Sequence, residues 1–433
     1  MLKLYMFMSM VMCMKRNKNC RNLDNTAKIF SVEEKKNTNT FRLTAFMVDK
    51  INPTFLKEAV LESLVNYPSY RVQLKSGFFW NKFIDNQKIP VVREEPYLKN
   101  RIIKFFKSNN YLFRVTYCNN MINLDVYHML TDGLGATIFF KDILKNYLNI
   151  KYNLECENTI KGASDSIFSK DKYLEKVDKS LLTTENKKKA FLIQDKSNYL
   201  RNKTYHFILD LKEIKANSKV SGVSISEYLS AIYLLALYNT IYDKNSKKDL
   251  VLNVPIDLRH HYNVEVYSNF FTCVSLNANI DRDNRVSFKY LLQQMKKEYR
   301  EKITDEKVEQ YLARDVVMGT NIAVNASPLF LKKFFMKYLG KLVSQSTTTT
   351  FSNLGIISLE EPYQKYIDNI VAIVNAGKYQ KIKCTVCTFK NNLTITINSN
   401  LFSDEFEKEF YKQLKKYAGK VEIKNNDFLK VKR

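Results

Sequence analysis

The residue with the clearest capacity for chemistry is His128, which ends a stretch that alternates like a β-strand. Ile122, Leu124, Val126 and His128 fall on one face, because strand side chains point alternately to opposite faces. His128 therefore continues an apolar, inward-facing row at the carboxyl end of the strand. An imidazole in that position suits a general base, because its pKa lies close to neutral pH.

A carboxylate, Asp132, follows His128 in a predicted turn at Thr131-Asp132-Gly133. Residues 134–148 then carry apolar side chains at helical spacing. Burying a carboxylate is costly unless it is paired, so its place beside a buried histidine is informative. On spacing alone, the commoner interpretation is a hydrogen-bonded core histidine followed by an ordinary turn aspartate. The other histidines occupy no comparable setting: His206, His260 and His261.

The elements that position His128 come from both sides of it. Residues 111–117 and 121–128 are predicted strands, joined at Asn119-Asn120, which tolerates the left-handed conformations of a tight hairpin. Upstream, the sequence predicts a strand over 40–48, a helix that begins at Asn52-Pro53, and a hairpin around Ser76-Gly77. The helix has an apolar stripe of Phe55, Leu56, Ala59, Val60 and Leu64. These elements predict an α+β half with a mixed sheet and covering helices.

A second half with similar elements follows a polar, charged crossover at 153–202. Ser224 and Glu227 form a capping-box pattern before a strongly apolar helix over 228–242. Further helices are predicted over 286–303, onward to Leu342, and over 405–417. Strands are predicted over 204–211, 249–259, 347–355, 370–374, 383–389 and 393–400.

Composition restricts the class of partner. The 433 residues suffice for two or three domains, and the formal charge is +25. The lysines are scattered and not clustered with aromatic residues, which argues against a nucleic-acid-binding protein. Weak attraction to an anionic membrane surface or an acidic ligand fits the charge better. Seven cysteines without a framework spacing fit a reducing cytoplasm, and Cys384 and Cys387 should point to opposite faces of a strand.

The N-terminus is apolar and rich in methionine over residues 1–14. This run is too short to span a bilayer, and most of its positive charge follows it, unlike a secretory signal. Met14 resembles an ordinary bacterial start, so residues 1–13 are interpreted as an upstream extension. No transmembrane segment is predicted elsewhere, and no serine-hydrolase elbow, phosphate-binding loop or dinucleotide glycine pattern is present.

Four segments together resemble one superfamily. His128-Met-Leu-Thr-Asp132-Gly133 resembles the HxxxDG motif of chloramphenicol acetyltransferases, non-ribosomal peptide condensation domains and alcohol or polyketide-associated acyltransferases. Residues 23–30 resemble the opening segment of the bacterial alcohol-acetyltransferase-like branch. Residues 253–259, with 268–271, resemble the second-half strand and loop, and 351–355 resemble the strand that faces the catalytic histidine. The segments occur in the expected order from Leu23 to near the C-terminus.

The resemblance implies an α+β fold of two chloramphenicol-acetyltransferase-like halves, with mixed sheets, covering helices and an active-site tunnel between them. Residues 1–22 would be an extension, 23–152 the N-terminal half, 153–202 the crossover and 203–433 the C-terminal half. The implied activity is transfer of an acyl group from acyl-CoA to a hydroxyl or amine of a small-molecule acceptor. A condensation-like enzyme with a donor bound to an acyl carrier protein, or a catalytically silent binding protein, are the alternatives.

The resemblance also assigns roles to residues. His128 would be the general base, and Asp132, Gly133 and Arg259 would be structural, with Asp132 ion-paired to Arg259. The oxyanion and tunnel candidates are Thr350, Ser352 and Asn353. No metal and no bound cofactor are implied, since acyl-CoA is a co-substrate. A DFGWG motif is absent, and Tyr127 stands where many relatives carry a second histidine, so the branch is not fixed.

Overall fold

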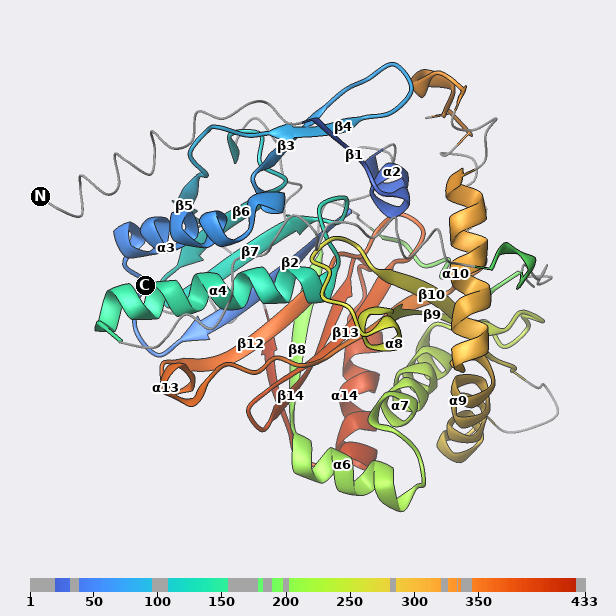
Figure 1. The fold of residues 1–433 in the computed structure, drawn as a ribbon. Coiled ribbons are helices and arrows are strands. Elements are labelled where there is room, and N and C mark those ends of the chain that lie inside the picture. The colour runs from blue at the N-terminus through green and yellow to red at the C-terminus, as the bar shows by residue number, and fades with distance from the viewer. Residues whose placement is uncertain are drawn as a thin grey trace, which may run out of the picture.

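The computed structural model contains two large mixed sheets, each covered by helices (Figure 1). It describes residues 20–31, 39–95, 108–154, 178–181, 189–197, 202–280, 286–320, 326–332, 334–335 and 345–425. Most of the predicted crossover, residues 1–19, and much of the helical segment predicted before Leu342 lie outside these ranges.

The first sheet has five strands in the order β12-β2-β7-β6-β5. Their bounds are β12 Ile367–Val374, β2 Thr40–Met47, β7 Met121–Tyr127, β6 Phe113–Cys118 and β5 Val92–Glu94. The predicted hairpin of β6 and β7 is confirmed, and Asn119 adopts the left-handed conformation with φ 51°. The predicted helix α3 (Pro53–Asn66) is also confirmed, with the Asn52 side chain accepting hydrogen bonds at its N-terminus.

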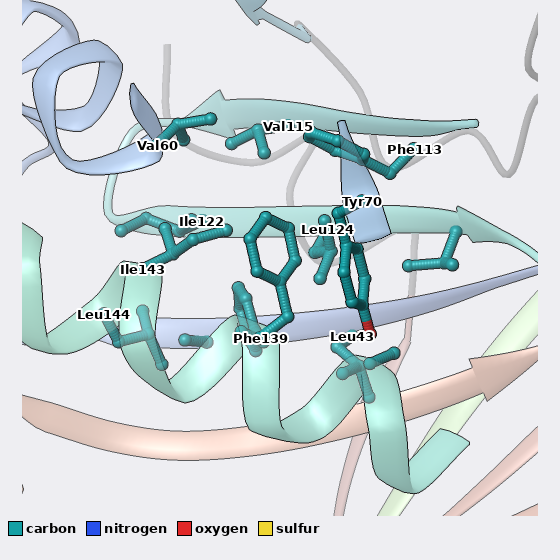
Figure 2. Close-up of a cluster of buried hydrophobic side chains, with 14 of the residues drawn as sticks. Leu43, Val60, Tyr70, Phe113, Val115, Ile122, Leu124, Phe139, Ile143 and Leu144 are labelled. Atoms are coloured by element: carbon teal, nitrogen blue, oxygen red, sulfur yellow. The ribbon is translucent and has the colours of Figure 1, made fainter. Parts of the chain in front are cut away.

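The core of this half lies between the first sheet and the helices α3 and α4 (Gly133–Tyr152). Figure 2 shows Phe139, Ile143 and Leu144 of α4 facing the side chains of the strands. Ile122 and Leu124 of β7 are fully buried there, in the apolar row expected from strand alternation. That row fixes the strand that leads directly into His128.

The opposite face of the same sheet is polar and equally buried. Asp125 of β7 pairs with Arg42 (Nε–Oδ1 2.7 Å) and with Arg114 (Nη2–Oδ2 2.6 Å). Burial by itself would raise the pKa of Asp125, but the charges of the two arginines hold it below 3.8. Glu95 adds a second carboxylate beside Arg42. Because each buried charge has a partner of opposite sign, these pairs tie β2, β7, β6 and the end of β5 together.

The second sheet has seven strands in the order β10-β9-β11-β13-β14-β8-β15. Their bounds are β10 Phe271–Ala278, β9 Leu250–Asp257, β11 Thr349–Ile356, β13 Ile382–Phe389, β14 Asn392–Ser399, β8 Lys203–Asp210 and β15 Val421–Asn425. It packs on α7 (Ile225–Thr240), α9 (Phe288–Lys302) and α14 (Glu405–Ala418). The predicted capping box of Ser224 and Glu227 is confirmed at the start of α7. The strand β15 and the helix α6 (Leu211–Val220) were not predicted.

The hairpin predicted around Ser76-Gly77 forms, but not as part of the large first sheet. Its strands, β3 (Val72–Lys75) and β4 (Lys82–Asp85), join β1 (Cys20–Asn22) in a separate sheet of order β1-β4-β3. Because β4 is paired on both sides, by β1 and β3, it has no free edge for the five-stranded sheet. The small α2 (Asn25–Ser31) follows β1, which lies within the predicted extension.

The C-terminal half supplies one strand to the sheet of the N-terminal half. β12 comes from the range assigned to the C-terminal half, yet it pairs antiparallel with β2, with Ala372 opposite Leu43. It also contacts the second sheet, where the Asn369 side chain donates to Thr394 (Nδ2–Oγ1 3.1 Å). The residue boundaries of the halves stay a prediction, but the N-terminal range does not form its sheet alone, because β12 completes it.

The remaining described elements are the helices α8 Arg259–Tyr262, α10 Asp305–Thr320 and α13 Glu361–Gln364, and the 3₁₀ turns Pro68–Tyr70 and Lys179–Leu181. Cys384 and Cys387 lie in the two different cores, so their predicted opposite orientation is confirmed. Within the described ranges, no cluster of three metal-ligating side chains occurs. No single described helix is long and apolar enough to cross a membrane; α6 and α7 pass that test only together, with an 89° bend between them.

Candidate active site

His128 follows the last residue of β7, and aromatic rings surround it. Its backbone nitrogen donates to the carbonyl of Asn39 (2.7 Å). Its ring stacks on Phe30 of α2, with centroids 4.5 Å apart, and lies 5.2 Å from Phe41 and 5.5 Å from Phe271. The side chain is only partly buried. The three aromatic neighbours therefore hold the imidazole in a fixed plane.

Asn269 determines which nitrogen of His128 carries the proton. The amide nitrogen of Asn269 donates to the backbone carbonyl of His128 (2.9 Å), which directs the amide oxygen at Nδ1 (3.2 Å). An amide oxygen can only accept, so Nδ1 must bear the hydrogen in the neutral ring. Nε2 then carries the lone pair, and this is the atom able to take a proton. Asn269 is fully buried, so the arrangement is rigid.

The surroundings of His128 keep its ring neutral. Burial lowers its pKa below 6.5, and the positive charge of Lys383 in β13 lowers it further. Asp132 and the hydrogen bond to Asn269 act in the opposite direction without reversing the shift. By contrast, His206 lies inside β8, bonded to Thr396 (2.9 Å), and burial lowers its pKa to about 4. His206 is 4% exposed, so His206, and not His128, is a hydrogen-bonded core histidine.

Asp132 begins α4 and accepts hydrogen bonds from both halves of the chain. Its Oδ1 accepts from the backbone nitrogen of Gly135 (2.9 Å), as an N-cap residue does, and its Oδ2 from that of Phe270 (2.8 Å). Arg259 Nη2 lies 2.9 Å from each carboxylate oxygen. The ion pair expected between Asp132 and Arg259 is therefore present, with both side chains 7% exposed.

Arg259 does not meet Asp132 with two parallel N–H groups of its guanidinium. One terminal nitrogen meets both oxygens of Asp132, and the other nitrogens serve different partners. Nε donates to the carbonyl of Val266 (2.6 Å) and Nη1 to Asp257 (2.5 Å). Nη2 also donates to the carbonyl of Ser268 (2.7 Å). Arg259 thus stabilises the irregular loop that carries Asn269. The same side chain holds the turn after His128 through Asp132.

Two glycines allow the second half to approach that turn. A methyl group on Gly133 would lie 2.5 Å from Cδ2 of Leu354, which belongs to β11. A methyl group on Gly135 would lie 2.1 Å from the Thr131 hydroxyl and 2.5 Å from the carbonyl oxygen of Tyr267. At Gly135 the contact is with backbone, so only a residue without a side chain fits there, whereas at Gly133 the end of the Leu354 side chain would have to move. Gly133 was expected at the site, whereas Gly135 was not.

The three candidates on β11 do not share one face. Thr349, Phe351 and Asn353 face α7: the Thr349 hydroxyl meets Tyr233 (2.8 Å) and the Asn353 amide donates to Ser226 (3.0 Å). Thr350, Ser352 and Leu354 alternate to the other face, on which Leu354 touches the turn after His128. Of the three candidates, Asn353 thus lies on the face of β11 opposite to Leu354.

Thr350 and Ser352 differ in their hydrogen bonding. The Thr350 hydroxyl is buried and donates to the side chain of Gln380 (2.8 Å). Ser352 is partly exposed. Lys383, which lies beside Thr350 in the strand register, was missed by sequence reasoning, as was Asn269. Nothing in a lysine within a β-strand indicates that its charge lies near a histidine of another sheet, so no local signal could have found it.

Breaking the ion pair should destabilise the fold. Asp132→Asn preserves an N-cap side chain but removes the charge opposite Arg259. We expect Asp132→Asn and Arg259→Met each to lower the free energy of unfolding by about 3–5 kcal/mol, because each leaves a buried group without its partner. Urea denaturation measures the loss. The double variant should lose less than the sum of the two.

Asp257→Asn is the matched control, because it removes the more exposed carboxylate beside Arg259. Asp257→Asn should lower the free energy of unfolding by clearly less than Asp132→Asn does. Strictly additive effects of Asp132→Asn and Arg259→Met in the double-mutant cycle would contradict a coupled pair.

Comparison with known proteins identifies the fold. No protein-family model and no curated protein matches the sequence. The first condensation domain of the calcium-dependent antibiotic synthetase matches with TM-score 0.64 and 10% identity, over 93% of this chain and 98% of that one. TRI101 of F. graminearum, complexed with ethyl coenzyme A, matches with TM-score 0.63 and 9% identity, over 94% and 100%. The TRI3 trichothecene 15-O-acetyltransferase of Fusarium sporotrichioides matches with TM-score 0.60 and 10% identity, over 92% and 94%.

At such identities the likeness shows the fold alone. The chain has the mixed α/β fold, with two helix-covered mixed sheets, that condensation domains and CoA-dependent acyltransferases share. The fold class predicted from the sequence is confirmed.

Proposed function

We propose that this chain is an acyltransferase that moves an acyl group from acyl-CoA to a hydroxyl or amine of a small-molecule acceptor. The observation that carries the proposal is the state of His128: Asn269 occupies Nδ1, and burial lowers the pKa of the ring, which keeps it neutral. A neutral imidazole with a free Nε2 lone pair is the group that such a reaction requires. A cytoplasmic location is part of the proposal.

The reaction needs one proton to move twice. Nε2 of His128 accepts the proton of the acceptor hydroxyl as its oxygen attacks the thioester carbonyl, and a tetrahedral oxyanion forms. The oxyanion then collapses, the carbon–sulfur bond breaks, and the thiolate leaves. The imidazolium returns its proton to that sulfur, so the products are an ester and free CoA. The Asp132–Arg259 pair takes no part in the transfer and holds the turn.

The oxyanion requires a hydrogen-bond donor on the wall opposite His128. Ser352 is the better candidate, because Asn353 faces α7 and the Thr350 hydroxyl already donates to Gln380. A tunnel that brings donor and acceptor together at His128 is part of the proposal. It is supported by the contact of Leu354 with Gly133, which joins β11 to the turn after the histidine.

The second candidate donor is an acyl group on a carrier protein. It is favoured by the condensation-domain match, which is as good as that to the CoA-bound protein, with TM-scores of 0.64 and 0.63. Release of free thiol from a series of acyl-CoAs, screened against alcohols and amines, separates the candidates. Turnover with free acyl-CoA supports the first, turnover only with carrier-bound acyl groups supports the second, and none with either indicates a silent binding protein.

Replacing His128 should remove the base and little else. His128→Ala is expected to lower turnover by about two to four orders of magnitude, the usual effect of losing a general base. His260→Ala is the matched control, because His260 is exposed and lies outside the aromatic surround of His128. Turnover of His128→Ala close to that of the parent, with unchanged circular dichroism, would exclude His128 as the base.

The pH profile should report the state of His128. A base works when it is neutral, so kcat/KM should rise with pH through the His128 pKa, with a midpoint below 6.5. Lys383→Met removes a charge that lowers this pKa and should move the midpoint to higher pH. Asn269→Ala removes a bond that raises it and should move the midpoint to lower pH, with a slower reaction. Shifts of the same sign in both variants would contradict the assignment.

Neighbouring residues on β11 provide a test of the oxyanion donor. Ser352→Ala should reduce kcat by about 10²–10³, the usual effect of losing one such donor. Asn353→Ala, on the opposite face of the strand, should leave kcat nearly unchanged. Steady-state kinetics with saturating acyl-CoA measures both, and a larger effect at Asn353 than at Ser352 would reverse the assignment.

A further inference from the structure

Six large apolar side chains lie exposed where two distant segments meet. The tip of the β3–β4 hairpin contributes Phe78 (70% exposed) and Phe79 (48%). The segment after α10 contributes Phe330 (69%), Leu331 (42%), Phe334 (74%) and Phe335 (61%). We call these six residues the apolar patch. Soluble proteins seldom expose so many large side chains together without a binding purpose.

The patch is held by specific contacts. The backbone nitrogen of Leu329, which is buried, donates to the carbonyl of Phe78 (2.8 Å). The amine of Lys332 donates to the carbonyl of Phe79 (2.9 Å) and lies 4.0 Å from the centre of the Trp80 ring. The two segments meet at the tip of the β3–β4 loop in Figure 1. Leu329 and Lys332 are both buried and hold the two segments together, while the phenylalanine side chains are exposed to solvent.

The two stretches that supply the patch carry charge of one sign. No aspartate or glutamate occurs in residues 63–84 or in residues 316–359, the two stretches that supply the patch. The first stretch carries the exposed Lys75 and Lys82 on the two strands of the hairpin. The charged residues of the second stretch are all lysines. An occupant of this surface must therefore offer an apolar interior and negative charge at its margin.

We propose that the apolar patch docks the protein on an anionic lipid bilayer. Phenylalanine side chains enter the boundary between headgroups and acyl chains, while lysines beside them contact anionic headgroups. A second copy of the chain fits less well. A symmetric dimer sets the same patch against itself, and this would oppose lysine to lysine.

The patch adjoins the helix that walls the candidate active site. Lys28 of α2 lies 5.3 Å from the Trp80 ring centre, and the Asn81 side chain donates to the carbonyl of Ser31 (3.3 Å). The same helix carries Phe30, which stacks on His128. Together with the proposed function, on which this step rests, docking here assigns the acceptor to amphiphilic alcohols or amines that reside in the bilayer.

Vesicle flotation tests the docking. The full chain is floated with phosphatidylcholine vesicles that contain or lack phosphatidylglycerol. Binding should require the anionic lipid and weaken as salt rises. Phe78→Ser combined with Phe334→Ser should reduce partitioning by roughly tenfold or more, because each phenylalanine loses its favourable burial. Lys75→Gln combined with Lys82→Gln should weaken binding only to the anionic vesicles.

Matched controls lie outside the patch. Phe402→Ser removes a phenylalanine that is 63% exposed, and Lys215→Gln with Lys219→Gln removes two exposed lysines of α6. These variants should float like the parent. Failure of the parent to float, or equal loss in the controls, would overturn the proposal. The proposal would also be overturned if a patch variant changed the molecular mass measured by light scattering but did not change flotation. The patch would then be an interface with a second copy of the chain.

Loss of membrane docking and loss of acyl transfer can be distinguished with two variants. His128→Ala should float like the parent while it loses acyl transfer. The Phe78→Ser and Phe334→Ser double variant should keep its turnover with a water-soluble acceptor and lose turnover with an acceptor embedded in anionic vesicles. Equal turnover of parent and double variant on the embedded acceptor would refute delivery from the bilayer.

Discussion

The carboxylate of Asp132 is buried where the two halves of the chain meet, and the local structure is arranged around its negative charge. A helix N-terminus from the first half and a loop nitrogen and arginine from the second all donate to it. No single half could satisfy the charge, since a helix N-terminus alone leaves one oxygen without a partner. The direction of α4, the path of the loop over 258–271 and the position of His128 are therefore set together.

The loop over 258–271 carries both a residue that stabilises the fold and a residue that positions the candidate base. Arg259 and Asn269 lie in it, one bound to Asp132 and the other to both the ring and the backbone of His128. The histidine consequently acquires its tautomer from the half of the chain that does not contain it. The absence of side chains at Gly133 and Gly135 makes this possible, because Leu354 and the backbone of Tyr267 lie against the turn. The site exists only when both halves are folded and docked.

The sequence predicted those parts of the structure that obey local rules. Alternation placed Ile122, Leu124 and Val126 on the buried face of β7, and the need to pair a buried carboxylate, with the superfamily resemblance, pointed to Arg259. It did not reveal Asn269 or Lys383, because their roles depend on distances between elements that no periodicity encodes. Among the three candidates on β11, alternation separates Asn353 from Thr350 and Ser352, because adjacent residues of a strand face opposite sides. The sequence also did not predict that β12 pairs with β2 in the first sheet. The reason is the same as for Asn269: the sequence of a strand does not specify which other strand it pairs with.

The pairing of β12 with β2 has a consequence for how the protein is made. Ala372 lies opposite Leu43, so the first strand of the five-stranded sheet waits for a partner that the ribosome adds much later. Until then, β2 presents an unpaired edge, and nascent chains with open edges are prone to pair with one another. Contacts this distant in sequence also slow folding, because closing a long loop costs conformational entropy before the contacts can form. The N-terminal sheet thus cannot be completed during synthesis of its own residues and must wait until β12 has been made.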